Sequence, residues 1–337
     1  MAPTVTYLTP PALASLPAAA GQLEFSSRAL VFPRDGGGIL RAWGDPDDPW
    51  VLRVEPAGAR WRITAWGADG PAARRAVRTV FSLDDPLEEF YRAARSEPVL
   101  RETPRRFRGL RIPRDGSLYE SLVHAVIGQQ LSVAVAATME RRLIALAGSV
   151  RRVEGLDVPF LPGPHRYLAL TPEEVATIGL SRAKRTALGA IARAAVAGGL
   201  DGPQDLARGD REAAVAHLDA FPGVGRWTAE NALLRGAGRR DLFLAGDLGI
   251  RVALAAYGVL PRDAPEATAR AWGDRWYPGW GSYATLYLWR KWVADGTPRP
   301  LSPGAPAGPP RRDGGRPRRG RAGSRRPRSP RRAAGRS

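Results

Sequence analysis

The chain has 337 residues and no cysteine, which excludes disulfides, thiolate zinc sites, thiol nucleophiles and cysteine-ligated iron–sulfur clusters. It has only three histidines (His124, His165 and His217), so no histidine-rich metal site is expected. The 51 basic and 33 acidic side chains give a net charge of +18, which favours a polyanionic partner.

Membrane and nucleotide partners are not expected. The sequence has no run of about 18 apolar residues, and its first residues lack the charged and apolar segments of a signal peptide. We therefore expect a cytoplasmic protein. A phosphate-binding loop of the G-x-x-x-x-G-K-[ST] type is also absent, so no nucleotide cofactor is expected.

Residues 1–105 predict a small α+β domain, in which glycine- and proline-rich turns separate segments rich in β-forming residues. Strands are expected at Gln22–Pro33, Ile39–Trp43, Trp50–Glu55 and Arg60–Trp66. Two helices are expected at Ala72–Phe81 and Pro86–Ser96, the second with Asp85 before a proline at its first position.

Residues 106–295 predict an all-α domain of at least eight helices. The segments Ser117-Leu-Tyr-Glu120 and Thr171-Pro-Glu-Glu174 are capping boxes. Helices with polar caps are also expected after Ser132, Ser181 and Asp210. The whole chain is therefore predicted to be α+β, with a helical domain after the mixed one.

The last 42 residues, 296–337, carry 13 arginines and one acidic residue, Asp313, for a net charge of +12. Proline, glycine, serine and alanine make up most of the rest, and Leu301 is the one large apolar residue. Such a segment cannot offset the entropy cost of ordering, so we expect a disordered basic tail. It is either a tether to phosphate groups or a product of the chain-wide bias of 49 arginines to two lysines.

The segment 218–236 predicts two helices joined by the tight turn Pro222-Gly223-Val224-Gly225. The two glycines permit positive φ angles and a close approach of the backbone to a ligand. The free amides at the start of the second helix favour an anion such as phosphate, whatever the base sequence. Val224 is expected to pack between the two helices.

This turn resembles the helix-hairpin-helix motif, and Asp247 follows Trp227 by 20 residues, as in the HhH-GPD superfamily of DNA glycosylases. Within it, the chain is most similar to the alkylation-repair type, 3-methyladenine DNA glycosylase II. Three further segments carry the resemblance, which covers about residues 20–295: Tyr119–Ser132, Gly179–Lys184 and Trp280–Trp289. It implies a monomeric repair enzyme, associated with the nucleoid, that flips damaged bases out of duplex DNA.

The resemblance implies that Asp247 is the catalytic residue. Breaking an N-glycosidic bond builds positive charge on the sugar, which a fixed carboxylate stabilises while it orients a water molecule. An aspartate before a helix is also a favoured N-cap, and both roles can hold. Arg251, one helical turn later, either pairs with Asp247 or is solvated.

The position of Trp227 separates two mechanisms. Family members that also cut the strand have a lysine there, so we expect a glycosylase without lyase activity that leaves an abasic site. The resemblance implies a base pocket of Trp227 and Trp289, with Trp280 and Tyr283 as further candidates, because aromatic faces attract cationic methylated purines. Each tryptophan is alternatively a core residue. Asn231 and Leu248 stand where some relatives have tyrosines, which leaves the lesion spectrum open.

The resemblance also assigns residues to the DNA backbone and to a wedge. The hairpin residues Pro222, Gly223, Val224, Gly225, Arg226 and Thr228 would contact the phosphates, with a monovalent cation possible at the hairpin and no other cofactor. Gln130 would fill the gap left by the flipped base, or Leu131 would, unless this turn only links two helices. Two alternatives stay open for the whole chain: the same fold acting on oxidised or deaminated bases, and a DNA-binding module without catalysis.

Overall fold

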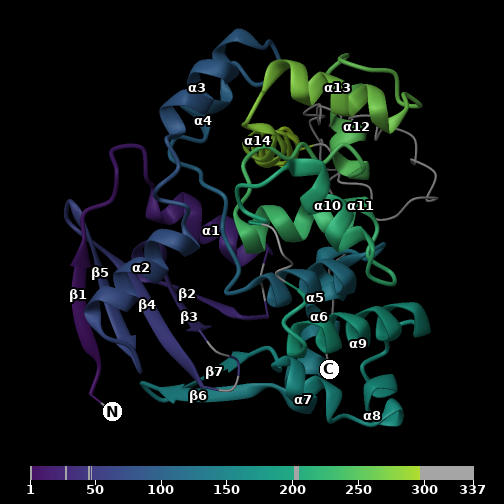
Figure 1. Ribbon diagram of the computed structural model, residues 1–337. Helices are drawn as coiled ribbons and strands as arrows, with labels where there is room; N and C mark the ends of the chain where they lie inside the picture. The colour runs from purple at the N-terminus through teal and green to yellow at the C-terminus, as the bar shows by residue number, and fades with distance from the viewer. Residues whose placement is uncertain (1, 27–28, 45, 47, 201–204, 297–337) are drawn as a thin grey trace, which may run out of the picture. The chain divides into compact units, whose positions relative to one another are not determined.

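The computed structural model describes residues 2–26, 29–44, 46, 48–200 and 205–296 (Figure 1). Apart from Gly296, the basic tail predicted at 296–337 lies outside these residues. None of the described helices is long and apolar enough to cross a membrane.

Five antiparallel strands form the N-terminal sheet in the order β1-β5-β4-β3-β2. They are β1 (Thr4–Leu8), β2 (Val31–Arg34), β3 (Gly38–Gly44), β4 (Pro49–Ala57) and β5 (Arg60–Trp66), with the 3-10 turn η1 (Asp35–Gly37) between β2 and β3. The predicted strands at Ile39–Trp43, Trp50–Glu55 and Arg60–Trp66 are confirmed. In β3, side chains alternate between the two faces of the sheet, so Leu40 and Ala42 face away from Arg41.

The strand predicted at Gln22–Pro33 is wrong in its first half. Leu16–Ser26 form helix α1, and only Val31–Arg34 form a strand. The buried residues of α1 recur at helical spacing: Leu16, Ala19, Ala20 and Leu23. Strand β1, at the sheet edge, was not predicted.

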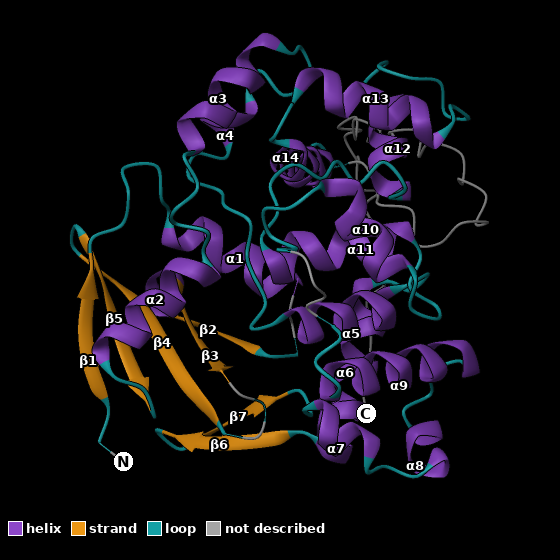
Figure 2. Ribbon diagram, in the orientation of Figure 1, coloured by secondary structure: helices purple, strands orange, loops and turns teal. Residues whose placement is uncertain are grey.

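Both faces of the sheet are covered (Figure 2). Helices α1 and α2 (Gly70–Val80) pack on one face. The hairpin of β6 (Ser149–Val153) and β7 (Leu156–Phe160) packs on the other. This hairpin lies within residues 106–295, which were predicted to be helical throughout, and it explains why Leu40 is fully buried on that face.

The rest of the described chain is helical, and the α+β class is confirmed. The helices are α3 (Leu87–Ser96), α4 (Thr103–Arg106), α5 (Leu118–Gly128), α6 (Val133–Ala147), α7 (Pro164–Leu168), α8 (Pro172–Thr177), α9 (Arg182–Val196), α10 (Arg211–Asp219), α11 (Arg226–Ala232), α12 (Leu248–Ala256), α13 (Glu266–Trp276) and α14 (Gly281–Ala294). A π-helical turn, η2 (Leu233–Ala237), continues α11.

The predicted helix starts are confirmed by their hydrogen bonds. The side chains of Ser117, Ser132, Ser181 and Asp210 each accept a bond from the backbone N–H three residues later. Thr171 forms the full capping box with Glu174. In the other predicted box, the carboxylate of Glu120 accepts from Gly116 N–H. Local polar chemistry therefore determines where these helices begin.

Candidate functional site

The turn between α10 and α11 has the expected hairpin form, with different roles for its two glycines. Gly223 has φ +77°, and a Cβ there would lie 2.8 Å from Cβ of Ala187 on α9, so only glycine fits. Gly225 has φ −88°, which any residue can adopt, and a Cβ there would meet nothing within 4 Å. Gly225 therefore leaves open space outside the protein, where a ligand backbone can approach. Val224 is 3% exposed and packs in the core as predicted.

Asp247 lies where α11, α12 and α14 meet. It is the N-cap of α12, and its Oδ1 accepts a hydrogen bond from Ile250 N–H (3.1 Å). The Trp289 indole of α14 donates to Oδ1 (3.1 Å), and the Trp227 indole of α11 donates to Oδ2 (3.2 Å). Asp247 is 5% exposed, whereas both tryptophans are half-buried. The carboxylate is therefore fixed in orientation by donors from three helices.

Trp280 and Tyr283 are in other surroundings. Tyr283 is fully buried, and its hydroxyl donates to Asp85 Oδ2 (2.7 Å). Burial raises the pKa of Asp85, although the bond from Tyr283 and the charge of Arg114 oppose this. Helix α3 begins at Leu87 with Pro86 in the N-cap position, so Asp85 bonds to Tyr283 and does not cap the helix. Trp280 is 8% exposed, and the Arg240 guanidinium lies over its ring, 4.6 Å from the ring centroid.

Two of the side chains expected to contact DNA phosphates bond within the protein. The Arg226 guanidinium donates to both carboxylate oxygens of Glu212 (2.8 and 2.9 Å) and to Glu230 (2.9 Å). These contacts, the bond to Glu212 first, raise the pKa of Arg226. Thr228 is 2% exposed and accepts from Gln129. The exposed part of the hairpin is therefore the backbone around Pro222, Gly223 and Gly225.

The turn Gln129–Leu131, which we call the wedge turn, connects α5 to α6. Gln130 is exposed and has φ +56°, a left-handed conformation unusual for glutamine. Leu131 is half-buried and packs against the main core. Of the two wedge candidates, Gln130 is thus the one whose side chain is accessible.

The two lysines bond outside the hairpin. Lys184 of α9 donates to the carbonyls of Ile127 (2.8 Å) and Gln129 (2.6 Å). Lys291 of α14 donates to Asp295 (2.6 Å) and lies over the ring of Tyr257. The role of Lys184 at the wedge turn was not predicted, because its partners are backbone atoms distant in sequence.

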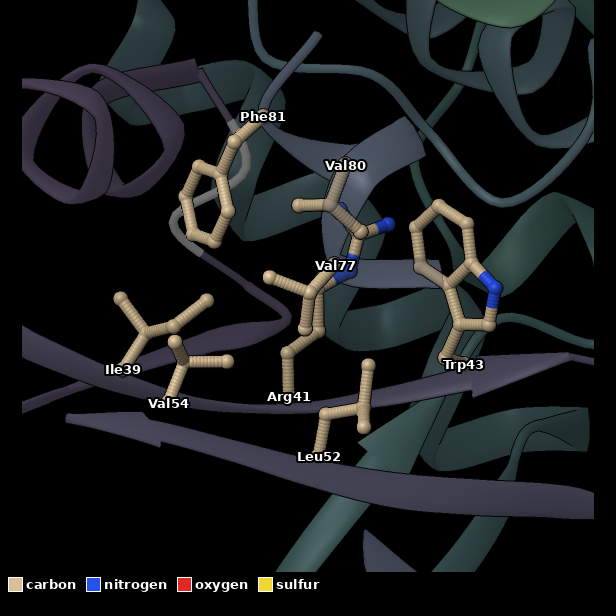
Figure 3. Close-up of a pocket in the computed structure, with 8 residues that line it drawn as sticks. All are labelled: Ile39, Arg41, Trp43, Leu52, Val54, Val77, Val80 and Phe81. Carbon is tan, nitrogen blue, oxygen red and sulfur yellow. The ribbon is translucent and has the colours of Figure 1, made fainter. Parts of the chain in front are cut away.

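A buried group of charged side chains, also not predicted, joins the sheet to α5. Arg41 rises from β3 among the apolar side chains around a small cavity, including Val77 of α2 (Figure 3), and pairs with Glu120 of α5. His124, one turn further along α5, has Nδ1 2.7 Å from Glu140 Oε1. Burial acts to lower the pKa of His124, but Glu140 and the bond to Glu120 raise it to about 10. Two features of the sequence could have indicated this cluster. Arg41 stands within an apolar strand, and Glu120 and His124 stand on an otherwise apolar helix.

Asp115 completes this buried cluster. It accepts two bonds from the Arg235 guanidinium (2.6 and 2.9 Å) and one from Ser121. Burial acts to raise its pKa, but Arg235 more than offsets this and lowers it. Potential ligand atoms of Asp115, Glu120 and His124 lie within 4.8 Å of one another. Guanidinium groups pair with both carboxylates, and Glu140 and Glu120 raise the pKa of the His124 imidazole, so this chemistry favours ion pairing over metal binding.

Comparison with known proteins gives a consistent result. Residues 123–278 match the family described as HhH-GPD superfamily base excision DNA repair protein. The chain is 36% identical over 181 residues to DNA-3-methyladenine glycosylase 2 of Escherichia coli strain K12, covering 54% of this chain and 60% of that protein. It is 30% identical over 210 residues to DNA-3-methyladenine glycosylase of Bacillus subtilis strain 168, covering 62% of this chain and 69% of that protein.

The fold is similar to that of a solved 3-methyladenine DNA-glycosylase from Archaeoglobus fulgidus. The TM-score is 0.73 at 23% identity, covering 86% of this chain and 98% of that one. The match to the E. coli protein spans less than two thirds of its length.

Proposed function

The chain belongs to the HhH-GPD superfamily of base excision DNA repair proteins, and from this we propose that it is a DNA N-glycosylase acting on alkylated bases, 3-methyladenine and related N-methylpurines, in duplex DNA. The observation that carries the proposal is the carboxylate of Asp247. The indole N–H groups of Trp227 and Trp289 donate to this carboxylate, and Trp227 belongs to the second helix of the helix-hairpin-helix motif. The names of the relatives from E. coli and B. subtilis support the alkylated-base class.

In the proposed reaction, the glycosidic bond breaks with its electron pair going to the base. An alkylated purine is already cationic, so it leaves as a neutral base. Asp247 stabilises the positive charge that develops on the sugar. A water molecule adds to the sugar carbon and loses one proton, leaving an abasic site. No cofactor is needed.

The flipped base is proposed to lie against the half-buried rings of Trp227 and Trp289, since aromatic faces attract cationic rings. Gln130 is proposed as the wedge, because it is exposed. Extrusion costs a few kcal/mol, which binding at the hairpin must supply. We further propose that the protein acts as a monomer. We also propose that it lacks lyase activity, because Trp227 stands where strand-cutting relatives have lysine.

The test is base release from methylated duplex DNA by the natural chain and by Asp247→Asn, with strand integrity followed separately. We expect release of 3-methyladenine by the natural chain, loss of release in the variant, and strand cleavage only after alkali. Spontaneous strand cleavage would contradict the absence of lyase activity. No release of any alkylated base would refute the proposed substrate class, and oxidised and deaminated bases would then be assayed.

A further inference from the structure

Gln129 bridges the wedge turn and the hairpin turn. Its side-chain amide donates to the carbonyl of Gly223 (2.9 Å) and to the hydroxyl of Thr228 (2.9 Å). These two acceptors lie on either side of the open position at Gly225. One side chain thus links the end of α5 to both sides of the hairpin turn.

Helix α9 contacts the same two turns from behind. Lys184 reaches the carbonyls of Ile127 and Gln129, which end α5. One turn further along α9, Ala187 packs against Gly223 so closely that a Cβ there would lie 2.8 Å away. The wedge turn, the hairpin and α9 therefore form one cross-linked unit.

We propose that Gln129 and Lys184 are positioning residues that clamp the wedge turn to the hairpin, so that Gln130 enters the base stack at a fixed place relative to the gripped backbone. This inference rests on the proposed function. Extruding a base requires force between the inserted side chain and the anchored phosphates. A turn that can yield transmits little of that force, whereas one bonded directly to the anchor transmits it.

Two observations favour such a role over simple helix capping. Gln130 is held at φ +56°, a conformation that costs free energy in a non-glycine residue and persists only where its surroundings enforce it. The ammonium of Lys184 is partly desolvated, and burial lowers its pKa. Lys184 belongs to α9 and not to α5, so its bonds to the carbonyls of Ile127 and Gln129 also fix the wedge turn to a neighbouring helix, which capping alone does not require.

The experiment compares Lys184→Met and Gln129→Met, which keep length and lose the donors, with Lys184→Arg and the control Arg193→Met. Arg193 is an exposed residue near the end of α9, so its replacement removes a charge from the same helix. One readout is single-turnover excision of the same lesion in paired duplex and in an unpaired bulge. The other is the fluorescence of 2-aminopurine placed beside a tetrahydrofuran abasic analogue, which reports wedge insertion without catalysis.

We expect each methionine variant at the clamp to slow excision from paired DNA by about 10- to 100-fold, the range for loss of a charge-assisted hydrogen bond at Lys184 or of two neutral hydrogen bonds at Gln129. Excision from the bulge is expected to stay within about threefold of the natural chain, because an unpaired base needs little extrusion. Lys184→Arg should restore most of the rate, and Arg193→Met should have no effect on the paired-to-bulge ratio. Bound fluorescence should fall in Lys184→Met.

Equal losses on paired and bulged DNA would mean a structural role only and would overturn the inference. So would an unchanged paired rate in both clamp variants, or no fluorescence response to the natural chain. If the natural chain gives the fluorescence response but releases no base, the proposed function fails. The clamp is then judged by whether Lys184→Met abolishes that response.

Discussion

The buried cluster of charges around His124 predicts a specific dependence of stability on pH. Glu120 of α5, Glu140 of α6 and Asp115 supply three anions to it. Arg41 pairs with Glu120 and Arg235 pairs with Asp115, so the charges balance only when His124 carries the third positive charge. Deprotonating His124 leaves an uncompensated buried carboxylate, which is strongly unfavourable.

The size and direction of the effect come from the pKa of His124. It rises from its ordinary 6.5 to about 10, because Glu140 and Glu120 outweigh the opposing effect of burial. At 1.36 kcal/mol per pKa unit, this corresponds to at most about 5 kcal/mol of folding free energy. Since the folded-state pKa is the higher one, this stabilisation is complete below pH 6.5 and is lost as the pH rises through about 10.

The assay is urea unfolding of the natural chain and of His124→Gln at several pH values between 6 and 10. The variant should be less stable by several kcal/mol at pH 6, and the gap should close by at most about 1.4 kcal/mol per pH unit. His165→Gln, at an exposed histidine, should show no such trend. A gap for His124→Gln that stays constant with pH would refute the reasoning, since the imidazole would then not be charged in the folded state.

Three further substitutions test the hairpin and the carboxylate. Gly223→Ala should lower the free energy of unfolding by about 1–3 kcal/mol in urea titrations, because of its positive φ and its contact with Ala187. Gly225→Ala should leave that free energy within about 0.5 kcal/mol but weaken duplex binding about tenfold or more by fluorescence anisotropy, because the new methyl fills the open space. Trp289→Phe keeps an aromatic ring, although a smaller one, and removes the donor to Asp247, so single-turnover excision should fall about 10- to 100-fold.

Features determined by nearby residues could be predicted from the sequence. Helix α6 begins after Ser132 and ends before Gly148 because its cap and its terminator both lie next to it in the chain. The hairpin turn and the N-cap at Asp247 follow from the same kind of local chemistry.

Features that depend on distant residues could not be predicted. The hairpin of β6 and β7 forms because the sheet offers an apolar face. Leu156, Val158 and Phe160 alternate along β7, but β6 has no such apolar alternation, and two strands of five residues stand within a region that is otherwise helical. The pair of Arg41 with Glu120 joins residues 79 positions apart. The region around Leu23 was mistaken for a strand because the helical repeat of α1 lies in a run of alanines.

Residue type and motif position also proved insufficient to assign a contact. Arg226 follows the hairpin glycines and has the charge that a phosphate contact requires. In the structure Glu212 and Glu230 take up that charge, so the arginine braces the start of α11. The exposed backbone of the hairpin, rather than its arginine, is therefore the stronger candidate for gripping phosphate.

The two interpretations of Asp247, helix cap and catalyst, describe one geometric requirement. The bond from Ile250 N–H that begins α12 also holds the carboxylate at the N-terminus of that helix, and the two indole donors further restrict its orientation. A catalytic anion must be held before the charge on the sugar develops, because reorganising it during the reaction adds to the barrier. Asparagine is as good an N-cap as aspartate, so Asp247→Asn preserves the start of α12 while removing the charge. A loss of activity in this variant without loss of stability would therefore assign the catalytic effect to the charge itself.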